Sequence, residues 1–450
     1  VSVASKAFDA IKKGFQIGRD FESMGKDVSR WMTAASDVDN AEKMAKNPPL
    51  FKKLFAAGSV EEEAMSAYIA KKKLQEQNKK QQDNYFPGAN TVGGYDKLAI
   101  KYGYTIVENE KQGIEQQVLK DIARRGRDGF YTGEVAEDMV NSLQKLGGLH
   151  TIGDFTDMEA FYTDPISGSF SKFELFEHPP NGQGATAILL ANILQNFPMS
   201  SMDPFGFERT HIETEATKLA YDARNRLVSD PRVFDATSKM TSDQLAVDLA
   251  NKISMNRVID DVSAIAEEVH KDTIYITVVD KDRMSVSLIY SIFHGFGSGI
   301  ASEKFGVLFQ NRGAGFNLVP GHFNEYGPNK RPMHTIIPAI VKEKGLIKMP
   351  FGVMGGQYQA TGHARILSNI YDFGMEIQTA LDAPRSFFEN GFLRIERGYS
   401  ERTVQKLSSL GHSIDQEIGP IGGAQAIKIN ENGVLEGASD PRKDGSAIGY

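Results

Sequence analysis

Residues 270–282, HKDTIYITVVDKD, contain the most strand-like run of the chain and decide how the rest is read. Thr273 opens the run TIYITVV, and a second β-rich run, SVSLIYSIF at 285–293, follows after DKDRM. β-Branched and aromatic residues favour strands, whereas aspartates such as Asp280 and Asp282 favour turns. The pattern therefore predicts a β-hairpin that begins at Thr273.

Thr273 is also placed where a new N-terminus would carry a nucleophile. A threonine hydroxyl attacks weakly unless a base accepts its proton. If the bond before Thr273 is cut, the free α-amine has an ordinary pKa of about 7.7–8.0 and can act as that base. Taken alone, a threonine at a strand start is more often just a strand former, so other motifs must decide.

Helical and strand patterns alternate around this hairpin. The segment 113–148 has apolar residues at helical spacing, interrupted at Gly126 and ended at Gly147 and Gly148. The segment GSFSKFELFEHPP (168–180) alternates like one strand. Further helices are predicted over 182–197, 209–227, 242–254, 363–374, 376–384 and 400–411. Strands between helices predict a layered α/β protein.

Composition excludes several classes of function. The net charge of −7 argues against a general nucleic-acid binder. The absence of cysteine excludes disulfides, thiol nucleophiles and cysteine metal sites. No HExxH motif or other ligand spacing links the histidines, including His294, His334 and His363, so we expect no metal and no cofactor. We also expect no membrane span, and the first residues lack the apolar stretch of a signal peptide.

Three glycine-rich motifs follow the hairpin. FHGFGSG (293–299) would let backbone approach a substrate, and GVMGGQ (352–357) offers adjacent N–H groups for an oxyanion hole. QNRGAGF (310–316) places Asn and Arg beside two glycines. Each motif alone is typical of a structural turn, as is NGQG (181–184) before a helix.

In order along the chain, these motifs resemble the γ-glutamyltranspeptidase family. The segments that carry the resemblance are GRDGFYTGEVAEDMV, PPNGQGATAILLANIL, DTIYITVVDKD, FGSGI, GVLFQNRGAGF, KRPMHTIIPAIV, GVMGGQYQATGH, DFGMEIQTALDAPR and GVLEGASDPRKDGSAIGY. They run from about residue 104 to 450. The resemblance implies a four-layer αββα sandwich of the N-terminal-nucleophile hydrolase type, made as one chain that cuts itself into a large and a small subunit.

The resemblance also implies roles for individual residues. The cut would lie between Asp272 and Thr273, and Thr273 would then attack a substrate amide. Gly355 and Gly356 match the oxyanion-hole pair, and Ser291 matches a hydroxyl residue that supports the nucleophile. Water would complete hydrolysis, whereas an amine acceptor would complete transfer. The expected partners are a small amide or peptide substrate and the two self-cleaved subunits.

The substrate-binding positions differ from those of the classical enzymes. Phe293 stands where they have an asparagine that holds the glutamyl group. In the loop with their Asn-Asn-x-Met-Asp-Asp-Phe pattern, this chain has Asn311 and Arg312, and Gly315 replaces the aspartate that grips the substrate ammonium. Their serine pair, which binds the substrate carboxylate, is here His334 and Thr335.

These differences change the expected substrate. The carboxylate partner of a positive α-amine is lost, whereas Arg312 favours an anionic acyl group. The pattern is more similar to the related acylases that remove glutaryl side chains from cephalosporins, and a glutaryl group is a γ-glutamyl group without its amine. We therefore expect amide hydrolysis of an anionic acyl substrate rather than classical glutathione transpeptidation.

Three segments are expected: 1–90, charged and helical; 104–272, part of the large subunit; and 273–450, the small subunit. Segment 1–90 occupies the place of the first large-subunit elements of the family. Residues 84–98, with proline and clustered glycine, are predicted to be a linker. Replacing strands and helices of a sandwich leaves apolar faces uncovered. The alternative is therefore an uncut, inactive scaffold whose helices at 50–82 bind a partner.

Four charged or titratable residues lie near the predicted cut or near the C-terminal motif. His270, beside the cut, is either a surface residue or an aid to autoprocessing. Asp440, Arg442 and Asp444 are predicted to form a structural ion-pair network near the site, without a catalytic role.

Overall fold

The computed structural model describes residues 111–259, 273–416 and 419–449. The predicted helical segment 1–90, the linker, His270 and Asp272 therefore lie outside the described residues. Contacts divide the chain into two units, residues 1–130 and 131–450. In the first, α7 (Lys111–Arg125) ends before Gly126, as predicted, and α8 (Asp128–Tyr131) begins. All that follows concerns the second unit.

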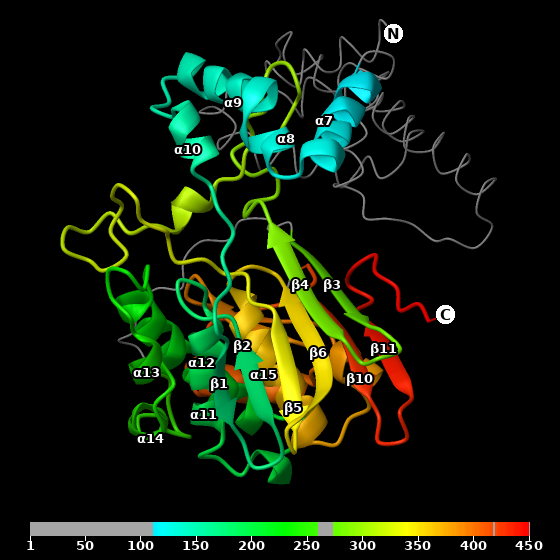
Figure 1. The fold of residues 1–450 in the computed structure, drawn as a ribbon. Coiled ribbons are helices and arrows are strands. Elements are labelled where there is room, and N and C mark those ends of the chain that lie inside the picture. Colours follow the sequence, from blue (N-terminus) through cyan, green and yellow to red (C-terminus); the bar gives the residue numbers. More distant parts are fainter. Residues whose placement is uncertain (1–110, 260–272, 417–418, 450) are drawn as a thin grey trace, which may run out of the picture. The chain divides into compact units, whose positions relative to one another are not determined.

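A six-stranded antiparallel sheet forms the centre of the second unit (Figure 1). Its strands, in spatial order, are β1 (Ile166–Ser169), β2 (Glu174–Glu177), β5 (Ala339–Glu343), β6 (Leu346–Met354), β10 (Gly423–Ile429) and β11 (Leu435–Ser439). Alternate residues such as Leu175, Val341 and Phe351 face one side and are fully buried. This alternation follows from the two-residue period of a strand.

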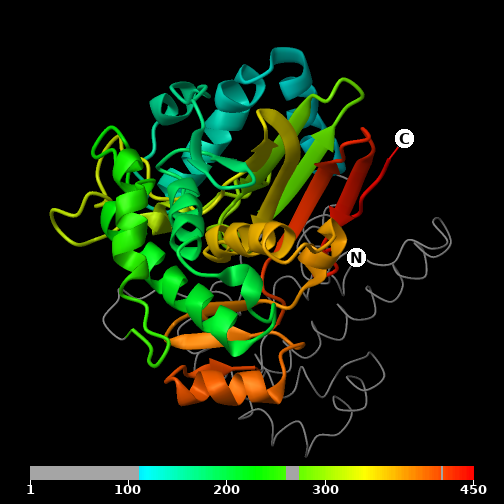
Figure 2. The same cartoon turned by 90° about the horizontal axis from the view of Figure 1, so that it is seen from below.

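Helices cover that buried face of the sheet, as Figures 1 and 2 show. The main ones are α11 (Gly184–Leu194), α12 (Phe207–Leu227) and α15 (Tyr358–Tyr371). Every residue of α11 is buried, which explains its apolar composition on all sides. Shorter elements are η1 (Met199–Ser201), α13 (Thr237–Met240), α14 (Asp243–Ala250) and α16 (Ile377–Asp382).

The predicted hairpin lies on the opposite face of the sheet and consists of β3 (Thr273–Val279) and β4 (Ser285–Ser291). The turn is closed by Asp280, whose carboxylate accepts from the N–H groups of Asp282 and Met284 at 2.9 and 2.8 Å. A Cβ on Gly352 of β6 would lie 2.3 Å from the Tyr275 ring. Only glycine therefore allows the two layers to approach this closely.

The outer face of the hairpin is apolar, whereas its inner face is rich in hydroxyl groups. The six outward side chains have exposed fractions of 43–51% and are Ile274, Ile276, Val278, Val286, Leu288 and Tyr290. The inward side chains of β4 include three serines. A sheet face of this kind is normally covered by another layer.

The remaining elements lie at the edges of this core. They are α9 (Gly133–Lys145), α10 (Ile152–Thr156), η2 (Arg312–Gly315), α17 (Glu401–Ser409) and a small sheet of β7 (Ser386–Glu389), β8 (Phe392–Ile395) and β9 (Ile414–Asp415). Among the described residues, no helix has the length and apolar character needed to cross a membrane.

Two predictions about this region need correction. Segment 168–180 is not one strand: β1 and β2 are antiparallel, and the N–H of Phe170 donates to the carbonyl of Phe173 at 2.8 Å. Segment 242–254 is helical only as far as Ala250. In both places the apolar pattern continues across a turn, because the turn residues also pack against the core.

The predicted ion-pair network near the C-terminus exists for two of its three members. Asp440 is buried and pairs with Arg385 and with Arg442, the latter at 3.1 Å. Arg442 also pairs with Glu396 at 2.6 Å. Asp444 is exposed and does not join the network. The network ties the end of β11 to the loop before β7.

Candidate active site

Thr273 and Ser291 form the centre of the candidate site. They are directly opposite each other at the open end of the hairpin, and the Thr273 hydroxyl donates to the Ser291 hydroxyl oxygen at 3.3 Å. The Ser291 oxygen also accepts from the backbone N–H of Phe293 at 2.9 Å. Both side chains are half-buried and face the central sheet. The hydroxyl predicted to be the nucleophile and the one predicted to support it are therefore within hydrogen-bonding distance of each other.

The turn Gly355–Gly356 lies at the same end of the stacked sheets as Thr273. The Thr277 hydroxyl donates to the Pro350 carbonyl at 3.4 Å, and Tyr275 packs on Gly352. The pairs Thr277–Pro350 and Tyr275–Gly352 show that β3 runs opposite to β6 in the layer above it. The next pair in this series places Thr273 beside the end of β6. The turn comes directly after β6 and precedes α15.

Both glycines of this turn have a backbone that favours glycine. Gly355 has φ 121° and Gly356 has φ 58°. A Cβ on Gly355 would also lie 2.8 Å from the Cα of Gly422. Their carbonyls accept from the N–H groups of Tyr358 and Gln359 at 3.2 Å each, which directs them into α15. The turn directly precedes the N-terminal end of α15, and the helix dipole there favours negative charge.

A buried polar network that the sequence analysis missed supports this turn. The Gln183 amide donates to the carbonyls of Thr335 and Gly356 at 2.8 and 3.0 Å. Arg224 donates to the side-chain oxygens of Gln183 and Gln357 at 2.8 and 2.5 Å. NGQG was interpreted as a turn and helix start, and Gln183 does precede α11. The additional contact with the glycine turn had no local signal in the sequence.

The loop with Asn311 and Arg312 lies next to Phe293. The Arg312 guanidinium is 4.5 Å from the centre of the Phe293 ring, and it donates to the Thr335 hydroxyl at 3.3 Å. Asn311 instead holds His294, by accepting from its backbone N–H at 3.1 Å and contacting its ring at 2.6 Å. Phe293 is buried and has φ 79°, a left-handed conformation that is uncommon for a bulky residue.

The Arg312 guanidinium has unused hydrogen-bonding capacity. Its Nη2 is buried without a hydrogen-bond partner among the described residues, and burial lowers the pKa of the group to about 10. No carboxylate in the described part of the chain forms an ion pair with Arg312. A buried cation without a counter-ion is costly. The arrangement is therefore suited to receive an anionic group.

His334 is the neutral member of this loop cluster. Burial, with the nearby charge of Arg312, lowers the pKa of His334 to about 3. Its backbone N–H donates to the carbonyl of Asn181 at 3.0 Å, and its Nδ1 has no partner among the described residues. The structure thus brings Phe293, Arg312, His334 and Thr335 into one region. Asn311 does not join them, because its side chain is bonded to His294.

Two other histidines lie in buried polar clusters. The His211 and His412 rings are joined by a hydrogen bond of 2.8 Å, and Glu215 lies close enough for the three to surround a metal ion. However, the Lys218 ammonium is 2.9 Å from Glu215 and already supplies a positive charge. These four residues are interpreted as a structural cluster. The i, i+4 spacing of His211 and Glu215 on α12 was the only sequence signal for it.

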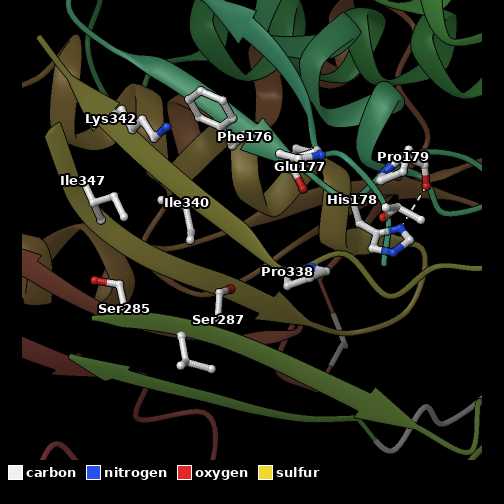
Figure 3. A pocket seen from close by; sticks show the side chains of 13 residues that line it. Phe176, Glu177, His178, Pro179, Ser285, Ser287, Pro338, Ile340, Lys342 and Ile347 are labelled. Atoms are coloured by element: carbon white, nitrogen blue, oxygen red, sulfur yellow. Dashed lines mark hydrogen bonds between the residues drawn. The ribbon is translucent and has the colours of Figure 1, made fainter. Parts of the chain in front are cut away.

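A cavity of about 520 Å³ lies on the same face of the sheet but away from Thr273 (Figure 3). Ser285 and Ser287 of β4 border it, together with Ile340 and Lys342 of β5 and Phe176 of β2. Ser287 is four residues from Ser291, about 13 Å along the strand. His178 also lines the cavity, and its ring centre is 6.4 Å from that of His334, so the cavity approaches the candidate site on the side of His334 rather than at Thr273.

The helix-covered antiparallel sheet, with a second β-layer that begins at a threonine, belongs to the N-terminal-nucleophile hydrolase class. A cephalosporin acylase from Bacillus halodurans superposes with a TM-score of 0.66 at 29% identity, over 86% of this chain and 74% of that one. A model of the γ-glutamyltranspeptidase family matches residues 53–450. The chain belongs to that family, and the match begins nearer the N-terminus than the motifs indicated.

Curated relatives in the family are hydrolases. The glutathione hydrolase-like YwrD proenzyme of Bacillus subtilis is 35% identical over 340 residues, which is 74% of this chain and 64% of that protein. The oxamate amidohydrolase proenzyme of Klebsiella pneumoniae is 31% identical over 344 residues, with the same coverage of each. This chain thus spans somewhat less than two thirds of the length of these relatives.

Proposed function

We propose that the chain is an autoprocessing amidohydrolase in which Thr273 is the nucleophile and its α-amine the base. The observation that carries this proposal is the position of the Thr273 hydroxyl, 3.3 Å from Ser291 and level with the glycine turn. The names of relatives as proenzymes and hydrolases support the same chemistry.

The proposed maturation uses the same hydroxyl. The Thr273 oxygen attacks the carbonyl carbon of Asp272, the C–N bond breaks, the hydroxyl proton passes to the Thr273 nitrogen, and the acyl group is left on the oxygen. Water then hydrolyses the ester, which leaves a carboxylate on Asp272 and a free α-amine on Thr273. The base is created by the cut itself.

The proposed catalytic cycle has two half-reactions. The α-amine takes the hydroxyl proton as the Thr273 oxygen attacks the substrate amide, and the glycine turn stabilises the oxyanion. The C–N bond breaks, the leaving amine takes the proton, and an ester remains on Thr273. Water attacks this ester and gives a proton to the α-amine; the bond between the acyl carbon and the Thr273 oxygen then breaks, that oxygen takes the proton back from the amine, and the acid leaves. An amine acceptor in place of water would give transfer.

The proposed substrate is an amide whose acyl group carries a carboxylate. Arg312, with an unused buried N–H group and a position beside Phe293, would bind that carboxylate. Gly315 has no charge to attract an ammonium group. Oxamate, the compound in the name of one relative, is also an amide with a carboxylate. The substrate class thus follows from the charge of the loop.

Intact-mass spectrometry of the purified chain, beside Thr273→Ala, tests the proposal. We expect two fragments that separate between Asp272 and Thr273, and a single uncut mass for the variant. A wild-type chain that stays uncut and releases no acyl group would overturn the proposal in favour of an inactive scaffold. A variant that still splits at this bond would exclude Thr273 as the nucleophile.

A further inference from the structure

Arg224 is a fully buried cation without an acidic partner. It lies on α12 with 1% of its surface exposed, and burial lowers the pKa of its guanidinium to about 10, which keeps it charged at neutral pH. Its hydrogen bonds go to three neutral amides, those of Gln183, Asn225 and Gln357. No carboxylate in the described residues forms an ion pair with it.

The other arginines with 2% or less of their surface exposed each have a carboxylate partner. Arg209 on the same helix pairs with Glu213 at 2.7 Å, Arg365 also pairs with Glu213, and Arg385 pairs with Asp440. Burying a charge is costly unless it is paired, and hydrogen bonds to amides compensate only in part. Arg224 therefore differs from them in having no carboxylate partner among the described residues.

The partners of Arg224 are the residues that hold the glycine turn. Gln183 joins Arg224 to the carbonyl of Gly356 through two consecutive hydrogen bonds of 2.8 and 3.0 Å. Gln357 directly follows Gly356, and its backbone carbonyl accepts from the buried Tyr221 hydroxyl. The charge thus lies beside the residues that hold the N-terminal end of α15.

We propose that Arg224 is a positioning residue for the oxyanion hole, which it orients through Gln183 and Gln357 and makes electrostatically positive. This inference rests on the proposed function of the Gly355–Gly356 turn. A fixed positive charge in a water-excluded site stabilises negative charge that develops in the transition state. It adds to the helix dipole in the same direction. Arg224 does not touch the substrate.

Two substitutions of Gln357 separate this role from a structural one. Gln357→Glu keeps an oxygen acceptor for Arg224 but neutralises the guanidinium. Gln357→Met has a similar size and stays uncharged, but it removes the acceptor. The measurements are the melting temperature of each full chain, and kcat and KM for an anilide of a dicarboxylic acid.

An electrostatic role and a purely structural role of Arg224 predict opposite orders of kcat for the two variants. If Arg224 acts through its charge, Gln357→Glu melts above the wild type, yet its kcat falls by about tenfold or more with KM little changed. Gln357→Met melts lower but keeps the higher kcat of the two. If activity instead follows stability, so that Gln357→Glu is the more active variant, the proposal is wrong.

Failure of the proposed function would be recognised separately. If the wild type has no turnover, the amidohydrolase proposal fails, but the melting temperatures still report on the charge of Arg224. A Gln357→Glu chain that melts below the wild type would show that the buried guanidinium has a counter-ion, which would overturn this inference whatever the activity.

Discussion

Thr273 and Ser291 face each other across the hairpin with their hydroxyl oxygens 3.3 Å apart. The pairing register sets this relationship, because a shift by one residue would turn one of the two side chains to the outer face. Ser291 in turn accepts from the N–H of Phe293, where the chain leaves β4 for the loops of the site. Strand pairing thus places the proposed nucleophile and the start of the proposed substrate-binding region together.

Ser291→Ala should slow both self-cleavage and turnover by about tenfold. The variant removes the acceptor of the Thr273 hydroxyl, and a lost hydrogen bond of about 1–1.5 kcal/mol corresponds to roughly that factor. A time course of fragment formation by intact mass checks the first effect. Ser285→Ala is the matched control, since Ser285 faces inward on the same strand, but among the described residues its hydroxyl donates only to the carbonyl of Arg283, at 3.2 Å. Equal rates for both variants would contradict the role of Ser291.

Arg312→Gln should lower kcat/KM for a carboxylate-bearing acyl donor by about 10- to 100-fold, because hydrogen bonds to a charged partner contribute roughly 1.5–3 kcal/mol. Turnover of the corresponding neutral butyryl amide should hardly change. Arg331→Gln serves as the control for general electrostatics, because its guanidinium lies over the Phe161 ring, 4.1 Å away, yet its charge still acts on His334. A loss of the same size for both donors would mean that Arg312 does not recognise the carboxylate.

The hairpin, the principal helices and the family were predictable from local sequence. TIYITVV and SVSLIYSIF have strong strand propensity, and Asp280 closes the turn with its own carboxylate. Glycine motifs could be assigned to turns because positive φ angles at Gly355 and Gly356 require that residue. These signals come from residues close together in the chain.

The supporting network could not be predicted, because its members are far apart in sequence. Gln183, Arg224 and Gln357 belong to three different elements, and only the stacking of α11, α12 and α15 brings them together. The same holds for the His211–His412 pair, whose residues are 201 positions apart. The hairpin in segment 168–180 was missed for a different reason: its turn residues Phe170 and Phe173 are apolar and stack on each other.

His412 should make the protein less stable in mild acid. Burial, with the nearby His211 ring and Lys218 ammonium, lowers the pKa of the His412 ring to about 3, while Glu215 partly balances Lys218. An unfolded histidine has a pKa of about 6.5, so the unfolded state binds one more proton between these values. The free energy of unfolding therefore falls as pH falls from about 6.5 towards 3, by up to about 1.4 kcal/mol per pH unit for this residue.

His412→Gln removes this proton but leaves an amide that can still donate to the His211 ring. Urea titrations between pH 7 and 4.5 should then show a shallower loss of stability, with a slope smaller by nearly one proton. His334→Gln should remove a second proton independently, since burial also lowers the pKa of His334 to about 3. Identical slopes for His412→Gln and the wild type would show that His412 titrates alike in the folded and unfolded chains, and that the buried cluster on α12 is open to water.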